Sequence, residues 1–502
     1  MKHLIIFMLL IQAAVFTQEL HITKIIPPDR KMNTNFGEAI GYENGLLVVG
    51  CPYDNKYGTQ SGSVYLYEID NISVNYKRKF FTWNIQQKDM LGRFINFEKG
   101  KLFFRVAGDP FAWFPSGDVH YFDVLDNQLD YQHIIRCPFP FNNEWFGKTI
   151  HNLKDRYIVS AEGSRDTSSS YYSVTGSFYI YSFNQDSLQL PQRYMGEARG
   201  ELQTGLGSGF VSNDSLLFVA ASGESDEQYR FRGCVYVYNI LHDTLIFREK
   251  VCSPMEQSGQ RFGRSMALSG NRLFIAAPQG DFAYDQGRVY VYDISGDSLK
   301  LTHTITAPNS SNINFFGLHL AALGDTLLVG APQDSSFGWN RGGIYLFQFD
   351  ESNNYRLERR ISLPDSADVL QFPSSVILTK DFILAGASYD DQMRGAVYMF
   401  SMDKPVGVEE TSPQKMNWEL GDNYPNPFNN QTKIRYQTVL PGRVRLLIYD
   451  ILGRELKVLK DEYHQAGIYE MEFTGDDMPS GIYFYTLETS GTRIVKKMVL
   501  MK

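Results

Sequence analysis

The sequence predicts an all-β chain, a seven-bladed β-propeller followed by a small antiparallel β-sandwich. First, one strand-rich unit recurs seven times at intervals of 53 to 59 residues, a strong sign of a repeat architecture. Second, the chain of 502 residues contains 31 tyrosines and 35 phenylalanines and shows no long amphipathic helical pattern. Third, the last copy of the unit lacks a strand that the N-terminal segment can supply.

The clearest copy of the unit lies between Phe316 and Phe347. It contains three short apolar runs, residues 318–323, 326–331 and 344–347, and the turn dipeptide Gly-Asp separates the first two. The second run, TLLVGA, is apolar almost throughout, so both of its faces are expected to be buried. A more polar run at 355–363 is suited to an outer edge. Four strands in a repeat of this length favour a propeller blade.

Two glycine-containing motifs locate the other six copies of the unit. The third strand opens with glycine at Gly62, Gly117, Gly176, Gly233, Gly287, Gly342 and Gly395. The unit itself opens with Phe-Gly or Leu-Gly at positions 36, 91, 146, 206, 262 and 316, and the matching position of the seventh copy reads Leu370-Gln371. After Phe400 the chain offers no fourth strand. Residues 19–26 resemble the outer-strand run 301–305, so they are expected to complete the seventh blade and close the ring.

The motifs Phe-Gly, Gly-Ala-Pro and Gly-x-Val-Tyr resemble FG-GAP repeats, as in the integrin α-subunit propeller, and the resemblance covers residues 18–403. Many such repeats carry a calcium loop between their first two strands. Here the matching turns read YENG (42–45), LSGN (268–271) and LGDT (323–326), which are too short and too poor in carboxylates to cage the ion. No metal and no cofactor are therefore expected.

The N-terminus has the layout of a secretory signal peptide, with Lys2 before an apolar stretch and small residues after it. Cleavage is expected near Thr17, which makes residues 1–17 the signal peptide and Gln18 the first mature residue. The apolar stretch is short for a membrane span, and no other stretch qualifies. We therefore expect an exported protein with no transmembrane span after cleavage.

Four cysteines would be free to oxidise outside the cytoplasm. Centring the hairpin of residues 235–247 on Asp243 places Cys234 opposite Cys252, which predicts a cross-strand disulfide if the geometry suits. Two buried free thiols in adjacent strands are the alternative. No pairing of Cys51 with Cys137 follows from the sequence, and the spacings do not resemble a zinc site.

Residues 404–420 lose the repeat and are interpreted as a linker, and residues 421–502 form a second β-domain. Its strand-like runs are 432–438, 443–450, 468–473, 481–488 and 493–502. This tail closely resembles the C-terminal sorting domain of the type IX (Por) secretion system of Bacteroidetes. The residues that carry the resemblance include Asn423, Pro425, Pro427, Phe428, Gly453, Arg454, Gly467, Gly481, Lys496 and Lys497. The resemblance implies the type IX machinery as a partner and an extracellular destination, secreted or attached to the outer membrane.

The sequence excludes several kinds of chemistry. The net charge of −8 argues against a nucleic-acid partner, and no H-E-x-x-H, G-x-S-x-G, P-loop or Cys-x-x-Cys motif is present. His319, on an innermost strand, and His120, which replaces a repeat tyrosine, are interpreted as structural. Asp334, Asp390 and Asp391 follow the second strands of their blades and are interpreted as solvated loop charges.

One pattern favours a binding function. The loops before the first strand and after the second strand of each blade are expected to share one face, and they hold all four tryptophans of the propeller, the opposite turns holding none. The candidate ligand-binding residues are Trp83, Trp113, Trp145, Tyr284 and Trp339, with Tyr53, Phe111, Phe114, Phe141 and Phe337 in the same loops. Aromatic residues on rigidly held loops suit a glycan or a protein ligand. Alternatively some of them, Trp145 above all, fold inward onto a blade core.

Three functions remain open from the sequence. The first is a cell-surface or secreted adhesion or binding protein without enzymatic activity, which the sequence favours. The second is a secreted propeller enzyme acting on polysaccharide, a lyase or a glycosidase. The third is a structural component of the envelope or matrix. No catalytic residue is identified for the second.

Overall fold

The computed structural model describes residues 21–502 except 71–72, 83–84, 107–116, 126–127, 139–144, 155, 165–174, 185–186, 190, 197–203, 227, 229–230, 243, 257, 279–286, 309–314, 337–339, 351–353, 364–368, 402–418, 439–441, 452, 465–466 and 489–492. The chain divides into two compact units, Met1–Lys404 and Pro405–Lys502.

Within these residues the first unit contains seven antiparallel sheets, the blades of a β-propeller. In the first six, strands pair largely in chain order. Blades one to three contain β2 (Ile40–Glu43), β3 (Leu46–Cys51), β4 (Ser63–Asp70) and β5 (Ser73–Phe80); β6 (Ile95–Glu98), β7 (Lys101–Val106), β8 (Asp118–Leu125) and β9 (Gln128–Arg136); β10 (Phe146–Leu153), β11 (Arg156–Ala161), β12 (Ser177–Asn184), β13 (Ser187–Leu188) and β14 (Gln192–Met195). In the third blade both β13 and β14 pair with β12, so its outer strand is split.

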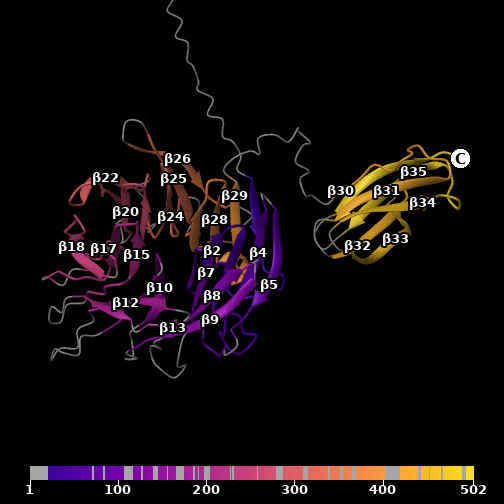
Figure 1. Cartoon of the computed structure of the whole chain (residues 1–502). Coiled ribbons are helices and arrows are strands. Elements are labelled where there is room, and N and C mark those ends of the chain that lie inside the picture. Colours follow the sequence, from indigo (N-terminus) through magenta and orange to yellow (C-terminus); the bar gives the residue numbers. More distant parts are fainter. Residues whose placement is uncertain are drawn as a thin grey trace, which may run out of the picture. The chain divides into compact units, whose positions relative to one another are not determined.

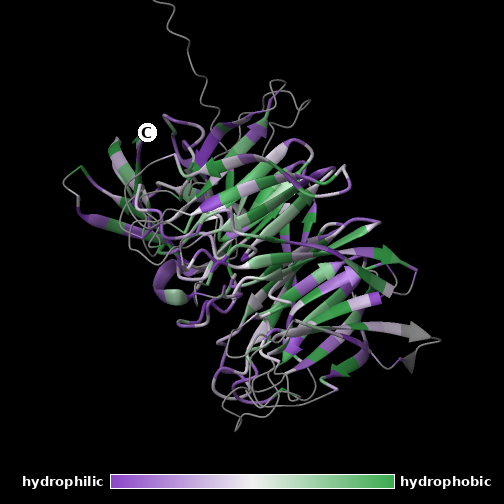
Figure 2. Cartoon of the chain, turned by 90° about the vertical axis from the view of Figure 1, so that its left-hand side faces the viewer, coloured by the Kyte–Doolittle hydropathy of each residue, from purple (hydrophilic) through white to green (hydrophobic). Residues whose placement is uncertain are grey.

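Blades four to six repeat the four-strand plan. They contain β15 (Gly209–Ser212), β16 (Leu216–Ala221), β17 (Cys234–Leu241) and β18 (Thr244–Cys252); β19 (Met266–Ser269), β20 (Arg272–Ala277), β21 (Arg288–Asp293) and β22 (Lys300–Thr306); β23 (His319–Leu323), β24 (Thr326–Ala331), β25 (Gly343–Phe349) and β26 (Tyr355–Ile361). As the unit at 316–347 predicts, the second strand β24 is almost wholly buried, and the fourth strand β26 alternates between partly buried and exposed residues up to the buried Ile361. Figure 2 shows green, apolar residues along the blade strands.

The seventh blade combines the two ends of the unit. Its strands are β27 (Ser375–Leu378), β28 (Phe382–Ala387), β29 (Ala396–Ser401) and, as the outer strand, β1 (Ile22–Ile25), which pairs antiparallel with β29. A helical turn, α1 (Asp390–Met393), lies between β28 and β29. The first strands of neighbouring blades contact each other around the whole circle, ending with β27 against β2, so the ring is closed (Figure 1).

The two glycine motifs lock neighbouring blades together. The glycine that opens each third strand has a positive φ, and its backbone lies against the aromatic or leucine residue that opens the following blade, as in the bridges Gly62 to Leu91 and Gly342 to Phe372. At Gly395 a Cβ would collide with the backbone oxygen of Phe36, so the same contact joins the last blade to the first. The side chain of Phe36 is fully buried and packs edge-on against Tyr65 of its own blade.

The same contact corrects the opening of the seventh copy. The residue that lies against Gly342 is Phe372, which is 1% exposed, whereas Leu370 is 41% exposed. The opening is therefore Phe372-Pro373 and not Leu370-Gln371. The sequence-based prediction was wrong at this position because proline follows the phenylalanine where the motif has glycine.

A disulfide joins Cys234 in β17 to Cys252 in β18, with the two Cα atoms 4.0 Å apart and directly opposite in the strand register. Cys51 and Cys137 are both buried and lie in the cores of different blades. Burial raises the pKa of the Cys51 thiol to about 12, so this thiol is protonated at neutral pH.

The second unit is an antiparallel β-sandwich. One sheet contains β30 (Glu419–Leu420), β31 (Gln431–Thr438) and β34 (Gly467–Thr474), and the other contains β33 (Glu455–His464), β32 (Gly442–Tyr449), β35 (Gly481–Glu488) and β36 (Arg493–Leu500). Between them lies an apolar core that includes Phe428, Tyr485 and Met498. The sequence missed two of these strands. β33 is mostly exposed and charged, and the residues of β30 were placed in the linker.

We predict that Gly395→Ala destabilises the propeller strongly, because the new Cβ meets backbone that closes the ring. Gly324→Ala is the matched control, since Gly324 also has a positive φ but nothing lies within 4 Å of its would-be Cβ. Both variants incur left-handed backbone strain, and Gly395→Ala should lose about 1–3 kcal/mol more from overpacking. Urea unfolding measures both, and equal losses would contradict the interlock.

Candidate functional site

The end of the propeller formed by the turns before each first strand and after each second strand is called here the loop face. Among the described residues, a buried acid holds the turn after the second strand in four blades. These acids are Asp54, Glu224, Asp334 and Asp390, each at most 3% exposed. The backbone oxygen of each accepts a hydrogen bond of 2.9–3.0 Å from the glycine that opens the third strand. The acids therefore belong to the blade framework.

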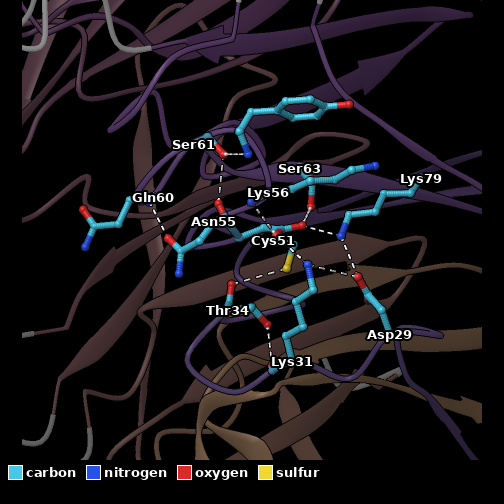
Figure 3. Close-up of polar contacts among 12 residues, drawn as sticks. Asp29, Lys31, Thr34, Cys51, Asn55, Lys56, Gln60, Ser61, Ser63 and Lys79 are labelled. Atoms are coloured by element: carbon cyan, nitrogen blue, oxygen red, sulfur yellow. Dashed lines mark hydrogen bonds and ion pairs between the residues drawn. The ribbon is translucent and has the colours of Figure 1, made fainter.

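In the first blade the acid belongs to a cluster of charged side chains, whose polar contacts are drawn in Figure 3. Asp54 accepts a hydrogen bond from the Ser63 hydroxyl at 2.9 Å and forms ion pairs with Lys79 and Lys31. Lys79 also donates to Asp29 at 2.8 Å. Burial alone would raise the pKa of Asp54, but the hydrogen bond and charge of Lys79 outweigh it and hold the pKa below its usual value. The cluster is thus ionised at neutral pH.

The strand register repeats this arrangement in other blades. A basic side chain of the outer strand lies directly opposite the tyrosine of the third strand, with its cationic group 4.7–5.8 Å from the ring centroid. The pairs are Tyr65 with Lys79, Tyr179 with Arg193, Tyr236 with Lys250, Tyr345 with Arg360 and Tyr398 with Lys24. Such contacts are favourable when partly desolvated. In blades one, four and seven the same cation also pairs with the buried acid, as Lys79 with Asp54, Lys250 with Glu224 and Lys24 with Asp390.

Two aspartates therefore differ from the sequence-based interpretation. Asp390 is 1% exposed, pairs with Lys24 at 2.6 Å and accepts a hydrogen bond from Tyr398 at 2.8 Å. Asp334 is also 1% exposed and bonds to the Tyr345 hydroxyl. They are not solvated loop charges, because the turn after the second strand directs them inward. Asp391 does stay at the surface, where it pairs with Arg30 and Arg394.

With the acid turned inward, the residue before it stays on the loop face. In blades seven and one these residues are Tyr389, 37% exposed, and Tyr53, which is partly buried. Burial raises the pKa of Tyr389, and the charges of Glu38 and Tyr53 raise it further, whereas Arg93 opposes them. Residues of the first and second blades therefore lie close enough to Tyr389 of the seventh blade to influence it electrostatically.

Arg93 has a second basic neighbour. The guanidinium carbons of Arg93 and Arg105 lie 5.7 Å and 5.6 Å from the centroid of the Phe94 ring. The Nε of Arg105 donates to the backbone oxygen of Phe146 in the third blade at 2.9 Å. Burial lowers the pKa of Arg105 to about 10, and the like charge of Arg93 contributes. The Arg105 side chain nevertheless remains protonated at neutral pH.

Of the aromatic residues that the sequence singles out as ligand-binding, Trp145 is described. It is 39% exposed, and the ammonium of Lys148 lies 5.2 Å from its ring centroid. It is therefore not folded into a blade core. Trp83, Trp113, Tyr284 and Trp339 lie outside the described residues. The structure instead brings Tyr389 to this face, which the sequence analysis overlooked because the seventh copy is the most divergent.

His120 and His319, the two histidines that the sequence analysis interprets as structural, are neutral at physiological pH. His120 in β8 is fully buried. Burial, and to a smaller extent the charge of Arg136, lowers its pKa to about 4. Neither of its ring nitrogens forms a hydrogen bond with a described residue. His319 in β23 is partly exposed to solvent, yet protein surrounds it on most sides, and burial followed by Arg264 lowers its pKa to about 4. Neither has a carboxylate partner in the described residues.

Several motif residues of the tail tie its first loop to its last strand. Asn423 is buried; its backbone N–H donates to the Tyr485 hydroxyl and its side chain donates to the oxygen of Pro425. Phe428, 1% exposed, fills the core while its backbone pairs with β36.

The other motif positions lie mostly at the surface or in turns. Pro425, Pro427 and Lys497 are exposed. Lys496 pairs with Asp422 at 2.7 Å, and Arg454 pairs with Asp450 at 2.6 Å across the turn that contains Gly453, whose φ is positive. Gly467 and Gly481 open β34 and β35.

Comparisons with known families agree with this two-part chain. Residues 422–501 match the secretion system C-terminal sorting domain, and residues 20–67 match the FG-GAP repeat. The chain therefore carries an FG-GAP repeat propeller and a sorting domain of the type IX (Por) system. The sorting domain indicates handling by the type IX machinery and secretion to the extracellular or cell-surface space. Among the described residues, no helix has the length and apolarity to cross a membrane.

Three solved structures that match this chain are distant from it in sequence. Pyrococcus horikoshii acylaminoacyl peptidase matches at 8% identity and a TM-score of 0.42, over 83% of this chain and 57% of its own. The periplasmic gluconolactonase PpgL of Pseudomonas aeruginosa matches at 15% identity and a TM-score of 0.44, over 85% of this chain and 98% of its own. A copper-bound fungal alcohol oxidase of the AA5 family matches at 10% identity and a TM-score of 0.44, over 96% of this chain and 99% of its own. The chain thus spans little more than half of the peptidase. No curated protein matches significantly. Likeness at this level assigns no activity.

We predict that Asp390→Asn destabilises the propeller by about 2–4 kcal/mol, because it removes one partner of an ion pair whose carboxylate is buried. Asp391→Asn is the neighbouring control and should cost less than about 1 kcal/mol, since Asp391 itself is partly exposed and pairs with the exposed Arg30 and the partly exposed Arg394. Chemical denaturation of the two variants measures the difference. If both cost the same, the inward position of Asp390 does not support the fold.

We also predict that a variant lacking residues 421–502 accumulates inside the cell envelope, because the sorting domain is what directs it outward. Immunoblots of cells and medium measure its distribution beside the full chain, and circular dichroism of the purified variant checks that its propeller is folded. Normal release of the variant would contradict the role of the tail.

Proposed function

We propose that this exported protein is a non-enzymatic binding protein that holds a glycan or protein ligand on the loop face of its propeller. The observation that carries the proposal is that Tyr389 and Tyr53 stand on the loop face of adjacent blades, each directly before a buried acid, and that the charges of Glu38 and Arg93 act on Tyr389. Tyrosine rings offer flat apolar area at low entropic cost, and the two charges can hydrogen-bond polar groups of a ligand.

The framework beneath the two tyrosines supports this proposal. The acids Asp54 and Asp390 follow the two tyrosines directly and are fixed by ion pairs with outer strands. These ion pairs fix the turns that carry the two tyrosines, and a fixed turn loses little freedom when a ligand binds. Functional residues are commonly displayed in this way, on loops that a rigid scaffold positions.

A second group of aromatic and basic residues lies on the same face of the first blade. Tyr57, 52% exposed, packs edge-on against Phe81 at 4.7 Å, and the Lys56 ammonium lies within 5.3 Å of both ring centroids. Trp83, Trp113, Trp145, Tyr284 and Trp339 extend this set in the sequence, and we propose them as further contacts of the ligand.

The polysaccharide-degrading alternative finds less support. Ser212 and His151, on the first strands of blades four and three, form a hydrogen bond of 2.7 Å, a pairing of nucleophile and base types. Burial lowers the pKa of His151 to about 4, which makes it a weak base at neutral pH. No carboxylate of the described residues forms an ion pair with His151 to orient it. The arrangement thus favours a structural polar contact.

We predict that the double variant Tyr53→Ala/Tyr389→Ala weakens ligand binding about tenfold or more, because each ring contributes on the order of 1 kcal/mol. A glycan and matrix-protein array identifies the ligand with the full-length mature chain, and titration then gives its Kd for each variant.

Tyr463→Ala is the control, since Tyr463 is 68% exposed but belongs to the sorting domain. Loss in the double variant alone supports binding on this face. Breakdown of the bound polymer would contradict a non-enzymatic role, and silence across the array would favour a purely structural component.

A further inference from the structure

We propose that the ligand of the loop face is a protein, and that an uncharged, apolar segment of this protein docks where blade seven meets blade one. The inference rests on the proposed binding function and names the kind of partner. It comes from a strained turn in blade seven, from two exposed methionines at that turn and beside it, and from the pairing of the charges around them.

The turn after the second strand of blade seven is short. Four residues separate the buried Asp390 from Gly395, whereas seven or eight separate the buried acid from the corresponding glycine in blades one, four and six. Three of the four, Asp391, Gln392 and Met393, form a left-handed turn, with φ values of 49°, 56° and 59°. This conformation is unfavourable for every residue but glycine, and such strain is concentrated at functional sites.

The side chains of the left-handed turn have different roles. Asp391 forms ion pairs with Arg30 at 2.6 Å and with Arg394 at 2.8 Å, so it stabilises the turn. Gln392 and Met393 are exposed, and no side-chain hydrogen bond or ion pair holds them to another described residue. Glycine would relieve the backbone strain at both positions. Side chains that are kept despite this strain and that face solvent are available to an external partner.

The segment that lies against the left-handed turn exposes a second methionine. The backbone N–H of Thr34 donates to the Met393 oxygen at 2.9 Å, and the N–H of Tyr53 donates to the Thr34 oxygen at 3.3 Å. Met32, two residues before Thr34, is 50% exposed, and Met393 is 42% exposed. Backbone hydrogen bonds therefore join the segments that carry both methionines and Tyr53 on the loop face.

These side-chain types favour a protein over a glycan. Methionine is flexible and polarisable, so it adapts to irregular apolar surfaces, and methionine and tyrosine are both enriched at protein interfaces. A thioether offers a sugar no hydrogen-bond donor and only a weak acceptor. Met32 and Met393, together with the neighbouring Tyr53 and Tyr389, therefore suit the apolar side chains of a peptide segment.

The charges around the methionines favour an uncharged segment. The carboxylate of Asp391 already pairs with two arginines, Arg30 and Arg394. The ammonium of Lys31, the residue before Met32, pairs with the buried Asp54 at 3.4 Å. A charged ligand group would have to compete with these ion pairs, whereas an apolar segment leaves them intact. Complementarity therefore calls for a contact segment without charge.

The test uses the full-length mature chain and two probes, a random peptide library displayed on phage and an array of neutral glycans. Peptides selected on the immobilised chain are synthesised, and their Kd values are measured by fluorescence anisotropy at low and high salt. We expect the selected peptides to share uncharged apolar residues. Their Kd should be the same at both salt concentrations, because salt screens charges but not apolar contacts.

Variants locate the site. Met32→Gln and Met393→Gln should each weaken peptide binding about tenfold, and both should fold because the two side chains are exposed. Met195→Gln is the matched control, since Met195 is 40% exposed but belongs to the outer strand β14 of blade three.

Met393→Gly separates the backbone strain from the contact. It should weaken binding as much as Met393→Gln does, while the melting temperature stays the same or rises, because glycine tolerates the left-handed backbone. A lower melting temperature would show that the Met393 side chain serves the fold, and would overturn its assignment to the ligand.

The other outcomes separate this inference from the function on which it rests. Equal effects of Met393→Gln and Met195→Gln, or selected peptides rich in charged residues, would also overturn it. If neutral glycans bind and Tyr53→Ala/Tyr389→Ala abolishes that binding while the methionine variants do not, the binding function stands and this inference falls. If no peptide, protein or glycan binds, both fall.

Discussion

The propeller depends on the contact between the glycine of one blade and the opening phenylalanine or leucine of the next. The glycine has no Cβ and a positive φ, so the neighbouring backbone can approach it directly. The opening side chain then fills the core of its own blade, as Phe36 does beside Tyr65. One motif therefore links blades while the other fills them, and both must recur at a fixed distance for the ring to form.

That requirement explains how much of the fold the sequence predicts. Seven blades, buried second strands and the closing N-terminal strand all follow from the spacing of these motifs. Motif spacing does not predict the opening at Phe372, because proline replaces the expected glycine there. It also misses β33, because an exposed edge strand such as ELKVLKDEYH has no buried face and so no alternating pattern.

The sequence predicts less of the candidate site than of the fold. Asp334 and Asp390 look like ordinary loop charges, and only the strand register brings the tyrosine and the cation of other strands beneath them. A signal was present: Lys79, Arg193 and Lys250 each follow the repeat tyrosine by fourteen residues. What no spacing provides is the proximity of Tyr53, Tyr389 and Arg93, which come from different blades.

The strand β1 has a consequence for the order in which the molecule assembles. Ile22–Ile25 must find a partner at Val397–Phe400, so this pairing links the two most distant parts of the propeller sequence. Contacts so far apart form late, after local hairpins. Until the chain has been made through the seventh blade, β1 has no strand to join and Lys24 has no Asp390 to pair with. Closure of the ring thus depends on a contact between the two ends of the propeller sequence, and without it the outer edge of β29 is unpaired.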